Sequence, residues 1–130
     1  MKLLIVLLLG TFLSLITTTN SALALDCQNP QTQTVMNQCA YSELERETAK
    51  INKTYNDYRA KLDPTRKQQL KEVQLAWIKF KDLACQFETS GTVGGSVHAM
   101  VLAECLIEKT RHRNKELETL ANCQEGDLSC

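Results

Sequence analysis

The chain has 130 residues and carries 15 acidic and 15 basic residues, so its formal net charge is zero at pH 7. Residues 1–24 have the composition of an export signal, and residues 25–130 carry 14 Lys and Arg against 15 Asp and Glu, a net charge of −1. A chain of this length forms one small domain, and its near-neutral charge argues against a nucleic-acid partner. A hydrophobic content of 43% argues against disorder.

The N-terminal segment has the three parts of a signal peptide. Lys2 precedes an apolar run from Leu3 to Ile16, and Ala22-Leu23-Ala24 supplies small residues for signal peptidase. The run, about 14 residues long, is too short to span a membrane. Cys27 follows Asp26 and not the small residue that lipid attachment requires. We therefore predict cleavage after residue 24 and an exported protein, periplasmic or secreted, that keeps no membrane anchor.

All six cysteines follow the predicted cleavage site. An even number of cysteines in an exported chain predicts disulfides, and without a CxxC motif these are expected to be structural and not redox-active. The predicted pairs are Cys27 with Cys39, Cys85 with Cys105, and Cys123 with Cys130.

Each predicted pair has its own basis. The last pair brackets a turn at Gly126, and the middle pair spans a Gly-rich connection between two helices. The first pair follows by elimination. It requires that Cys27 lie outside the helix that holds Cys39, because 12 helical steps would separate the two by about 18 Å.

Helical periodicity divides residues 25–130 into three segments, separated by Asp63-Pro64 and by the Gly-rich stretch 90–96. The first helix is predicted from about Thr32 to Leu62. Asp63 is expected to cap the second helix, with Pro64 at its first position. The third is predicted from about Val97 to Ala121. We expect an all-α fold in which these three long antiparallel helices form a small bundle stapled by disulfides.

Apolar residues at helical spacing predict the buried face of each helix. In the third helix, the segment 108–115 is unusually polar, which predicts a buried polar group there. The expected inward positions are Met36, Ala40, Leu44, Thr48, Ile51, Tyr55, Tyr58 and Leu62 in the first helix, Leu70, Val73, Trp77, Phe80, Ala84 and Phe87 in the second, and Leu102, Leu106, Leu117 and Leu120 in the third.

One polar pair is predicted between the second and third helices. Thr110 and Arg113 lie near the continuation of the third apolar stripe, and Asp82 lies near the corresponding face of the second helix. We expect Asp82 and Arg113 to form a buried or half-buried ion pair that fixes which helix faces meet.

The Gly-rich connection is the best candidate for partner binding. It holds three of the five glycines of the chain, and a backbone with few side chains can enter a cleft that bulkier segments cannot. It lacks the lysine and the preceding strand of a phosphate-binding loop. An inert connection between helices is the alternative. The candidate residues are Ser90, Gly91, Gly94, Gly95, Ser96 and His98.

No catalytic constellation is evident. The chain has two histidines, His98 and His112, and no strand-turn-helix setting for a nucleophilic serine. Glu104, Glu108 and His112 recur at i, i+4 and i+8 and could face a metal, but a surface pair of Glu108 with His112 explains the same residues. We therefore expect a protein without enzymatic activity, metal or cofactor.

Several motifs resemble those of the LprI-like lysozyme-inhibitor family. The most specific is Q-x-x-W-x-x-x-x-D-x-x-C from Gln74 to Cys85, supported by Cys105 and by T-x-x-R from Thr110 to Arg113. The similarity extends over about residues 27–120. One departure is Lys81, where the family commonly has Arg. The family pattern covers Trp77, Asp82, Cys85, Cys105, Thr110 and Arg113, to which we assign structural roles.

The resemblance implies a small, secreted, cysteine-stapled helical domain, and the family's prototype is a lipoprotein that binds and inhibits lysozyme. The leading hypothesis is thus an exported protein whose Gly-rich loop occludes the cleft of a lysozyme. Local acidity from Glu43, Glu45 and Glu47 would favour a basic lysozyme. The alternative is a structural or protein-interaction module of the cell envelope with another partner.

Overall fold

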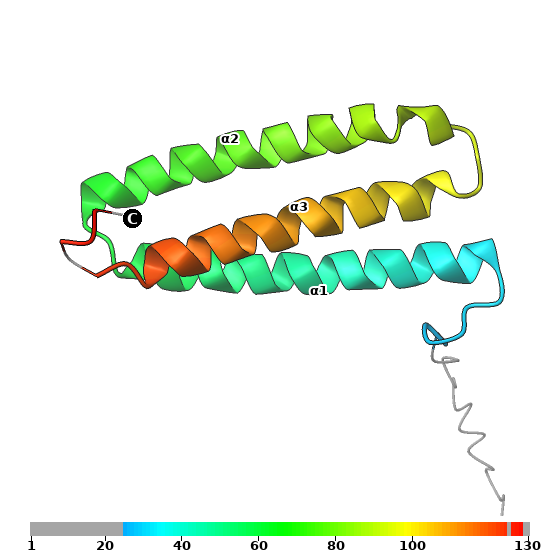
Figure 1. The fold of residues 1–130 in the computed structure, drawn as a ribbon, viewed down its shortest axis with the longest axis horizontal. Coiled ribbons are helices and arrows are strands. Elements are labelled where there is room, and N and C mark those ends of the chain that lie inside the picture. Colours follow the sequence, from blue (N-terminus) through cyan, green and yellow to red (C-terminus); the bar gives the residue numbers. More distant parts are fainter. Residues whose placement is uncertain (1–24, 125, 129–130) are drawn as a thin grey trace, which may run out of the picture.

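A computed structural model describes residues 25–124 and 126–128 of the chain. The predicted signal peptide and Cys130 lie outside these residues. The described chain forms three long helices, α1 (Gln33–Ala60), α2 (Pro64–Glu88) and α3 (His98–Ala121), with a short 3-10 helix, η1 (Ser90–Thr92), between the last two (Figure 1). Within the described ranges there is no strand, and the predicted all-α class is confirmed.

Side-chain caps set the starts of the first two helices. The Thr32 hydroxyl accepts a hydrogen bond from the Val35 amide at 3.2 Å, and the Asp63 carboxylate accepts one from the Arg66 amide at 3.0 Å. Pro64 occupies the first turn of α2, where its missing N–H removes no helical hydrogen bond. The turn between α1 and α2 is therefore determined locally, as the sequence predicted.

The three helices do not pack equally. Consecutive helices run antiparallel, as predicted, so α1 and α3 run parallel to each other (Figure 1). The most extensive contact is between α1 and α3, which lie side by side along their length, whereas α2 contacts α3 much less and α1 least. The bundle is therefore a tight parallel pair with α2 held on its flank.

The apolar core lies toward the end of the bundle that holds the Asp63 turn. Its buried members are Ile51 and Tyr58 from α1, Leu70 from α2 and Leu117 from α3. The predicted stripe of α1 is inward except at Thr48, which is exposed. The partly buried residues packed on this core are Tyr55, Leu62, Trp77, Leu120 and Ala121.

The buried face of α3 is rotated from the predicted one. Leu117 is fully buried as expected, but Leu102 and Leu106 are only partly covered. The predicted burial of polar groups in the middle of this helix is confirmed, because Thr110, Arg113 and Asn114 are buried. The buried positions of α3 are Ala103, Ile107, Thr110, Arg113, Asn114 and Leu117.

The predicted inward stripe of α2 is wrong at three positions. Val73, Phe80 and Phe87 are exposed. The buried row is instead Leu70, Gln74 and Cys85, with Trp77 half-buried beside it. Gln74 bonds to Arg113 and Cys85 is bridged to Cys105, both on α3. These two links rotate α2 so that its most apolar side faces away from the bundle.

Two of the three predicted disulfides are confirmed. Cys27 and Cys39 are bridged with their Cα atoms 5.6 Å apart, and Cys27 precedes α1, as this pairing required. Cys85 and Cys105 are bridged with a Cα separation of 5.7 Å. The third pair remains a prediction, since Cys130 is outside the described residues. None of the described helices has an apolar stretch long enough to cross a bilayer.

The burial pattern predicts a sharp contrast between two large apolar side chains. Leu117→Ala empties a fully buried position and should lower the free energy of unfolding by about 2–5 kcal/mol. Phe87→Ala removes a ring that is exposed in the single chain, so in dilute, monomeric protein it should change the free energy of unfolding by less than about 0.5 kcal/mol. Urea unfolding of the oxidised protein measures both. Equal losses in the two variants would contradict the assigned rotation of α2.

Candidate functional site

The Gly-rich loop begins on a buried anchor. Thr89 follows α2 and is 4% exposed, and its hydroxyl donates to the Cys85 carbonyl at 2.7 Å. The Thr92 amide then donates to the Thr89 carbonyl at 3.0 Å, which forms the turn of η1. Because Cys85 is itself bridged to α3, the start of the loop is fixed to two helices.

A second set of bonds closes the loop onto α3. The Thr92 hydroxyl lies 2.7 Å from the Thr89 carbonyl and 2.8 Å from Nδ1 of His98, the first residue of α3. A threonine hydroxyl has one proton, and the carbonyl can only accept, so the imidazole Nδ1–H donates to the hydroxyl. His98, predicted to contact a partner, therefore stabilises the loop through a hydrogen bond inside it.

The remaining predicted loop residues form an exposed surface. Ser90, Gly91, Gly94, Gly95 and Ser96 are all exposed, so the structure brings the predicted set together at one end of the bundle (Figure 1). Gly94 has φ +84°, a conformation that favours glycine. A Cβ at Gly91 would meet no atom within 4 Å.

The loop is also tied to α1. The Asn37 side chain donates to the Ser96 carbonyl at 3.0 Å. Two apolar side chains, Val93 in the loop and Phe87 at the end of α2, are exposed beside it. Phe87 was not predicted to be a surface residue, because its spacing matched the buried stripe of the helix. The loop end is thus held by all three helices and presents backbone flanked by apolar side chains.

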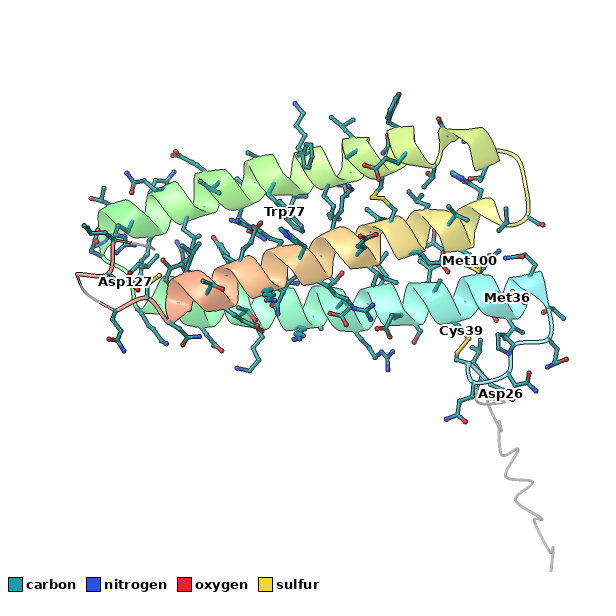
Figure 2. The ribbon with its side chains drawn as sticks, viewed as in Figure 1. Asp26, Met36, Cys39, Trp77, Met100 and Asp127 are labelled. Carbon is teal, nitrogen blue, oxygen red and sulfur yellow. A yellow bond between two sulfur atoms is a disulfide. The ribbon has the colours of Figure 1, made fainter. Side chains whose placement is uncertain are left out.

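An apolar groove lies between α1 and α3 near the same end of the bundle. Figure 2 shows Met36 and Cys39 on α1 and Met100 on α3 in this region. The groove has a volume of about 550 Å³. Its lining is mostly apolar with four charged side chains, and it consists of Pro30, Met36, Cys39, Ala40, Glu43, Met100, Glu104, Ile107, Glu108 and Arg111.

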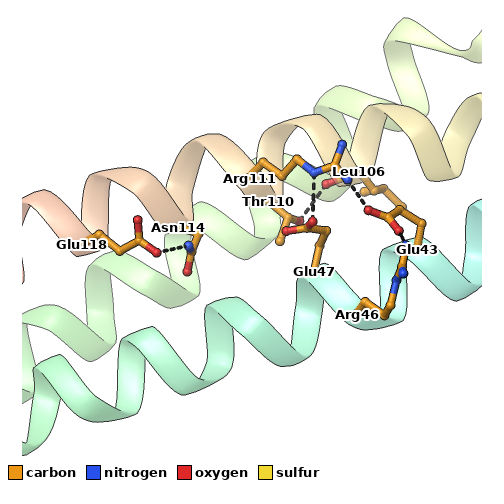
Figure 3. A network of polar contacts seen from close by, with 8 residues as sticks. All are labelled: Glu43, Arg46, Glu47, Leu106, Thr110, Arg111, Asn114 and Glu118. Atoms are coloured by element: carbon orange, nitrogen blue, oxygen red, sulfur yellow. Dashed lines mark hydrogen bonds and ion pairs between the residues drawn. The ribbon is translucent and has the colours of Figure 1, made fainter.

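Ion pairs divide the carboxylates around this groove into two groups. Arg111 on α3 donates through Nε to Glu47 on α1 at 3.0 Å and also contacts Glu43, which in turn contacts Arg46 (Figure 3). Glu43 and Glu47 thus link the two helices and are largely neutralised, contrary to the acidic surface expected of them. The two other lining carboxylates, Glu104 and Glu108, form no ion pair with any residue in the described ranges.

The groove was missed in the sequence because it needs two helices that are distant in the chain. The spacing of Met100, Glu104, Ile107 and Arg111 does place them along one side of a helix. What the sequence did not indicate is that this side faces α1 and not α2.

The predicted Asp82–Arg113 ion pair is wrong. Asp82 contacts Lys81 at 2.8 Å, whereas Arg113 donates to Gln74 at 3.2 Å and to Glu116 at 2.8 Å. The reason is the direction in which the Asp82 side chain points. Lys81 lies on the covered side of α2, and the next residue, Asp82, points about 100° away from it around the helix. Arg113 still joins α2 to α3, but through an amide instead of a carboxylate.

The other family-pattern residues have structural positions. Trp77 packs against the core, and the Lys81 ammonium lies 5.8 Å from the centre of its ring, within range of a cation–π contact. Thr110 is buried, and its hydroxyl donates a hydrogen bond to the Leu106 carbonyl at 2.7 Å. Lys81, at the position where the family commonly has Arg, therefore covers the tryptophan ring and forms no bidentate contact.

The residues weighed as metal ligands do not assemble into a site. His112 Nδ1 lies 3.1 Å from Glu116, so the histidine pairs with Glu116 instead of Glu108, the predicted partner. In residues 25–124 and 126–128, no group of three or more His, Cys, Asp or Glu side chains is placed to hold a metal ion.

Fold and site together define a small three-helix domain stapled by disulfides, with a fixed loop at one end. A family model described as lysozyme inhibitor LprI matches residues 26–117, and the chain belongs to this family. A curated relative, the uncharacterised protein R02472 of Rhizobium meliloti (strain 1021), is 32% identical over 114 residues, which cover 78% of this chain and 82% of the relative. No solved structure matches the chain.

The Cys85–Cys105 bridge is predicted to hold the loop end together. Replacing both cysteines by Ala opens a ring with a sequence separation of 20 and should lower the free energy of unfolding by roughly 3 kcal/mol. Hydrogen exchange should accelerate at residues 85–98 more than in the α1–α3 core. Chemical unfolding and exchange mass spectrometry measure the two effects. Uniform acceleration across all helices would contradict a local role.

Proposed function

We propose that this protein is an exported inhibitor of a lysozyme and that its loop end enters the substrate cleft of that enzyme. Membership of the lysozyme inhibitor LprI family is the observation that carries the proposal. The two described disulfides support export, because such bonds persist in oxidising compartments. No chemistry by the inhibitor is required, since a glycosidase needs an open groove between its two carboxyl groups.

The loop suits this role because its shape is set before binding. Hydrogen bonds from Thr89, Thr92 and His98 fix its backbone, so little conformational entropy remains to be lost in a complex. Its exposed glycines make it narrow, and the exposed Val93 within the loop offers an apolar anchor. The loop therefore combines a thin profile with a fixed shape.

The charge of the neighbouring groove supports a basic enzyme as the partner. Glu104 and Glu108 line the groove on the second and third turns of α3, and their charges are not neutralised by an ion pair within the described chain. With a net charge of −1 over residues 25–130, long-range steering is weak and attraction must come from such local carboxylates.

The proposal is tested by lysis of a peptidoglycan suspension with a lysozyme and the purified, oxidised mature protein. Dose-dependent inhibition is expected. Gly91→Arg adds a bulky cation where the loop has open space and should raise the inhibitory concentration at least tenfold. Gln69→Arg, at an exposed position in the first half of α2, is the control and should leave it unchanged.

Two negative outcomes are distinct. Unchanged inhibition by Gly91→Arg would contradict the loop mechanism while leaving inhibition itself intact. Absence of inhibition across several lysozyme types would contradict the function and favour the alternative, an envelope interaction module with another partner.

The role of the groove carboxylates is tested separately. The double variant Glu104→Gln and Glu108→Gln should weaken inhibition severalfold at low salt, and the difference should shrink at high salt because screening removes the same attraction. Glu72→Gln on α2 serves as the control for loss of an exposed carboxylate. A salt-independent loss in the double variant would indicate disrupted packing and contradict the electrostatic role.

A further inference from the structure

Helix α2 carries an unusual amount of exposed apolar surface. Of the ten large hydrophobic side chains exposed in the described residues, six lie on this helix. These side chains are exposed because α2 is rotated. The Gln74 amide and the Cys85 sulfur face α3, where they bond to Arg113 and Cys105. Contiguous apolar surface of this kind on a small protein commonly marks an interaction site. The six residues are Val73, Leu75, Ile78, Phe80, Leu83 and Phe87.

Most of this surface forms one ordered stripe. Its positions are separated by 3, 4, 3 and 4 residues, the spacing of the a and d positions in a coiled coil. They span about 80° of the helix circumference and so share one face of α2, on which Phe80 also borders a cavity toward α3. Leu75 and Ile78 fall outside the stripe and line a separate cavity toward α1. The α2 stripe consists of Val73, Ala76, Phe80, Leu83 and Phe87.

The area of the α2 stripe approaches what a stable dimer needs. Its four large side chains are 53% (Val73), 63% (Phe80), 56% (Leu83) and 82% (Phe87) exposed. With about 150–250 Å² for a fully exposed aromatic side chain and less for Val and Leu, these four expose roughly 400–500 Å² per copy. In the antiparallel register described below, Phe87 lies opposite Gln69 of the second copy, so two facing copies approach the lower limit of about 1,000 Å² for a specific interface only when flanking residues are included.

We propose that the α2 stripe is the interface of a homodimer in which the α2 helices of two copies pack antiparallel. A two-fold axis makes such a stripe its own partner, because the same residues face each other from both copies. In the antiparallel register that matches a with d positions, Ala76 faces Phe80 of the second copy, and Val73 faces Leu83 of the second copy. Each layer then combines a smaller with a larger side chain.

This dimer leaves the loop and the α1–α3 groove uncovered. The stripe lies on α2, while the groove is formed by the other two helices. The antiparallel arrangement directs the two Gly-rich loops toward opposite ends of the assembly, and the C-terminal ends of the two α2 helices lie about 30 Å apart along the helix axis in this register. The inference is independent of the proposed lysozyme inhibition, because it rests only on the exposed face of α2.

A matched pair of variants tests the interface. Leu83 and Leu75 are both leucines of α2 and both 56% exposed, but Leu75 lies about 120° from the centre of the stripe. Sedimentation velocity of the oxidised mature protein should show a dimer for the wild type and for Leu75→Glu. Leu83→Glu should raise the dimer dissociation constant at least a hundredfold. Phe80→Ser provides a second stripe variant should Leu83→Glu fail to fold.

The orientation has its own test. Ala76→Leu should weaken the antiparallel dimer, because the added side chain collides with Phe80 of the second copy. In a parallel dimer Ala76 would face Ala76, and the same change would fill the layer and strengthen association. A strengthened dimer would therefore overturn the antiparallel arrangement.

Three results would overturn the proposal as a whole. The first is a wild-type protein that remains monomeric at about 100 μM, a concentration well above typical dissociation constants of specific interfaces. The second is an equal effect of Leu83→Glu and Leu75→Glu on association. The third is a monomer that co-sediments with vesicles of mixed neutral and anionic lipids, which would assign the stripe to a membrane surface.

Discussion

The arrangement of this bundle depends on how Arg113 is accommodated. Arg113 is 8% exposed, and its guanidinium donates to Gln74 across the α2–α3 interface and pairs with Glu116 on its own helix. A buried cation of this kind is costly to leave without partners, so Gln74 must face α3. The Cys85–Cys105 bridge lies three helical turns further along α2 and imposes the same rotation. The apolar exterior of α2, the half-buried Trp77 and the position of the Gly-rich loop all follow from these two links.

Much of the fold could be read from the sequence because its determinants are local. Periodicity located the three helices, Asp63 and Pro64 set the first turn, and the requirement for Cys27 to precede the helix of Cys39 was met. The family resemblance was equally accessible through motifs in single segments. The rotation of α2 was not predicted, because Val73, Phe80 and Phe87 fit a buried stripe by spacing. The buried contact between Gln74 and Arg113 and the Cys85–Cys105 bridge distinguish the two faces, and the spacing of apolar residues does not reflect either of them.

The candidate site also has a part that was predictable from local sequence and a part that was not. The loop residues were predictable because glycine content reports directly on backbone freedom and lack of side-chain bulk. The α1–α3 groove was not, since it requires knowing that the first and third helices form the closest pair. The pairing of Glu43 and Glu47 with Arg111 also joins residues more than 60 positions apart in the chain. The positions of acidic residues in the sequence therefore did not show which carboxylates remain without an ion pair.

The disulfide behind the loop has a consequence for a chain that is exposed to proteases. Exposed glycine-rich segments are preferred sites of proteolytic cleavage, and the span 90–96 is the most accessible connection between described helices. A single cut there would not separate α2 from α3, because Cys85 and Cys105 remain covalently joined. The nicked molecule would migrate as one species until it is reduced, and its helices would stay assembled while the loop lost its fixed shape. Chain integrity in such a protein has to be judged under reducing conditions.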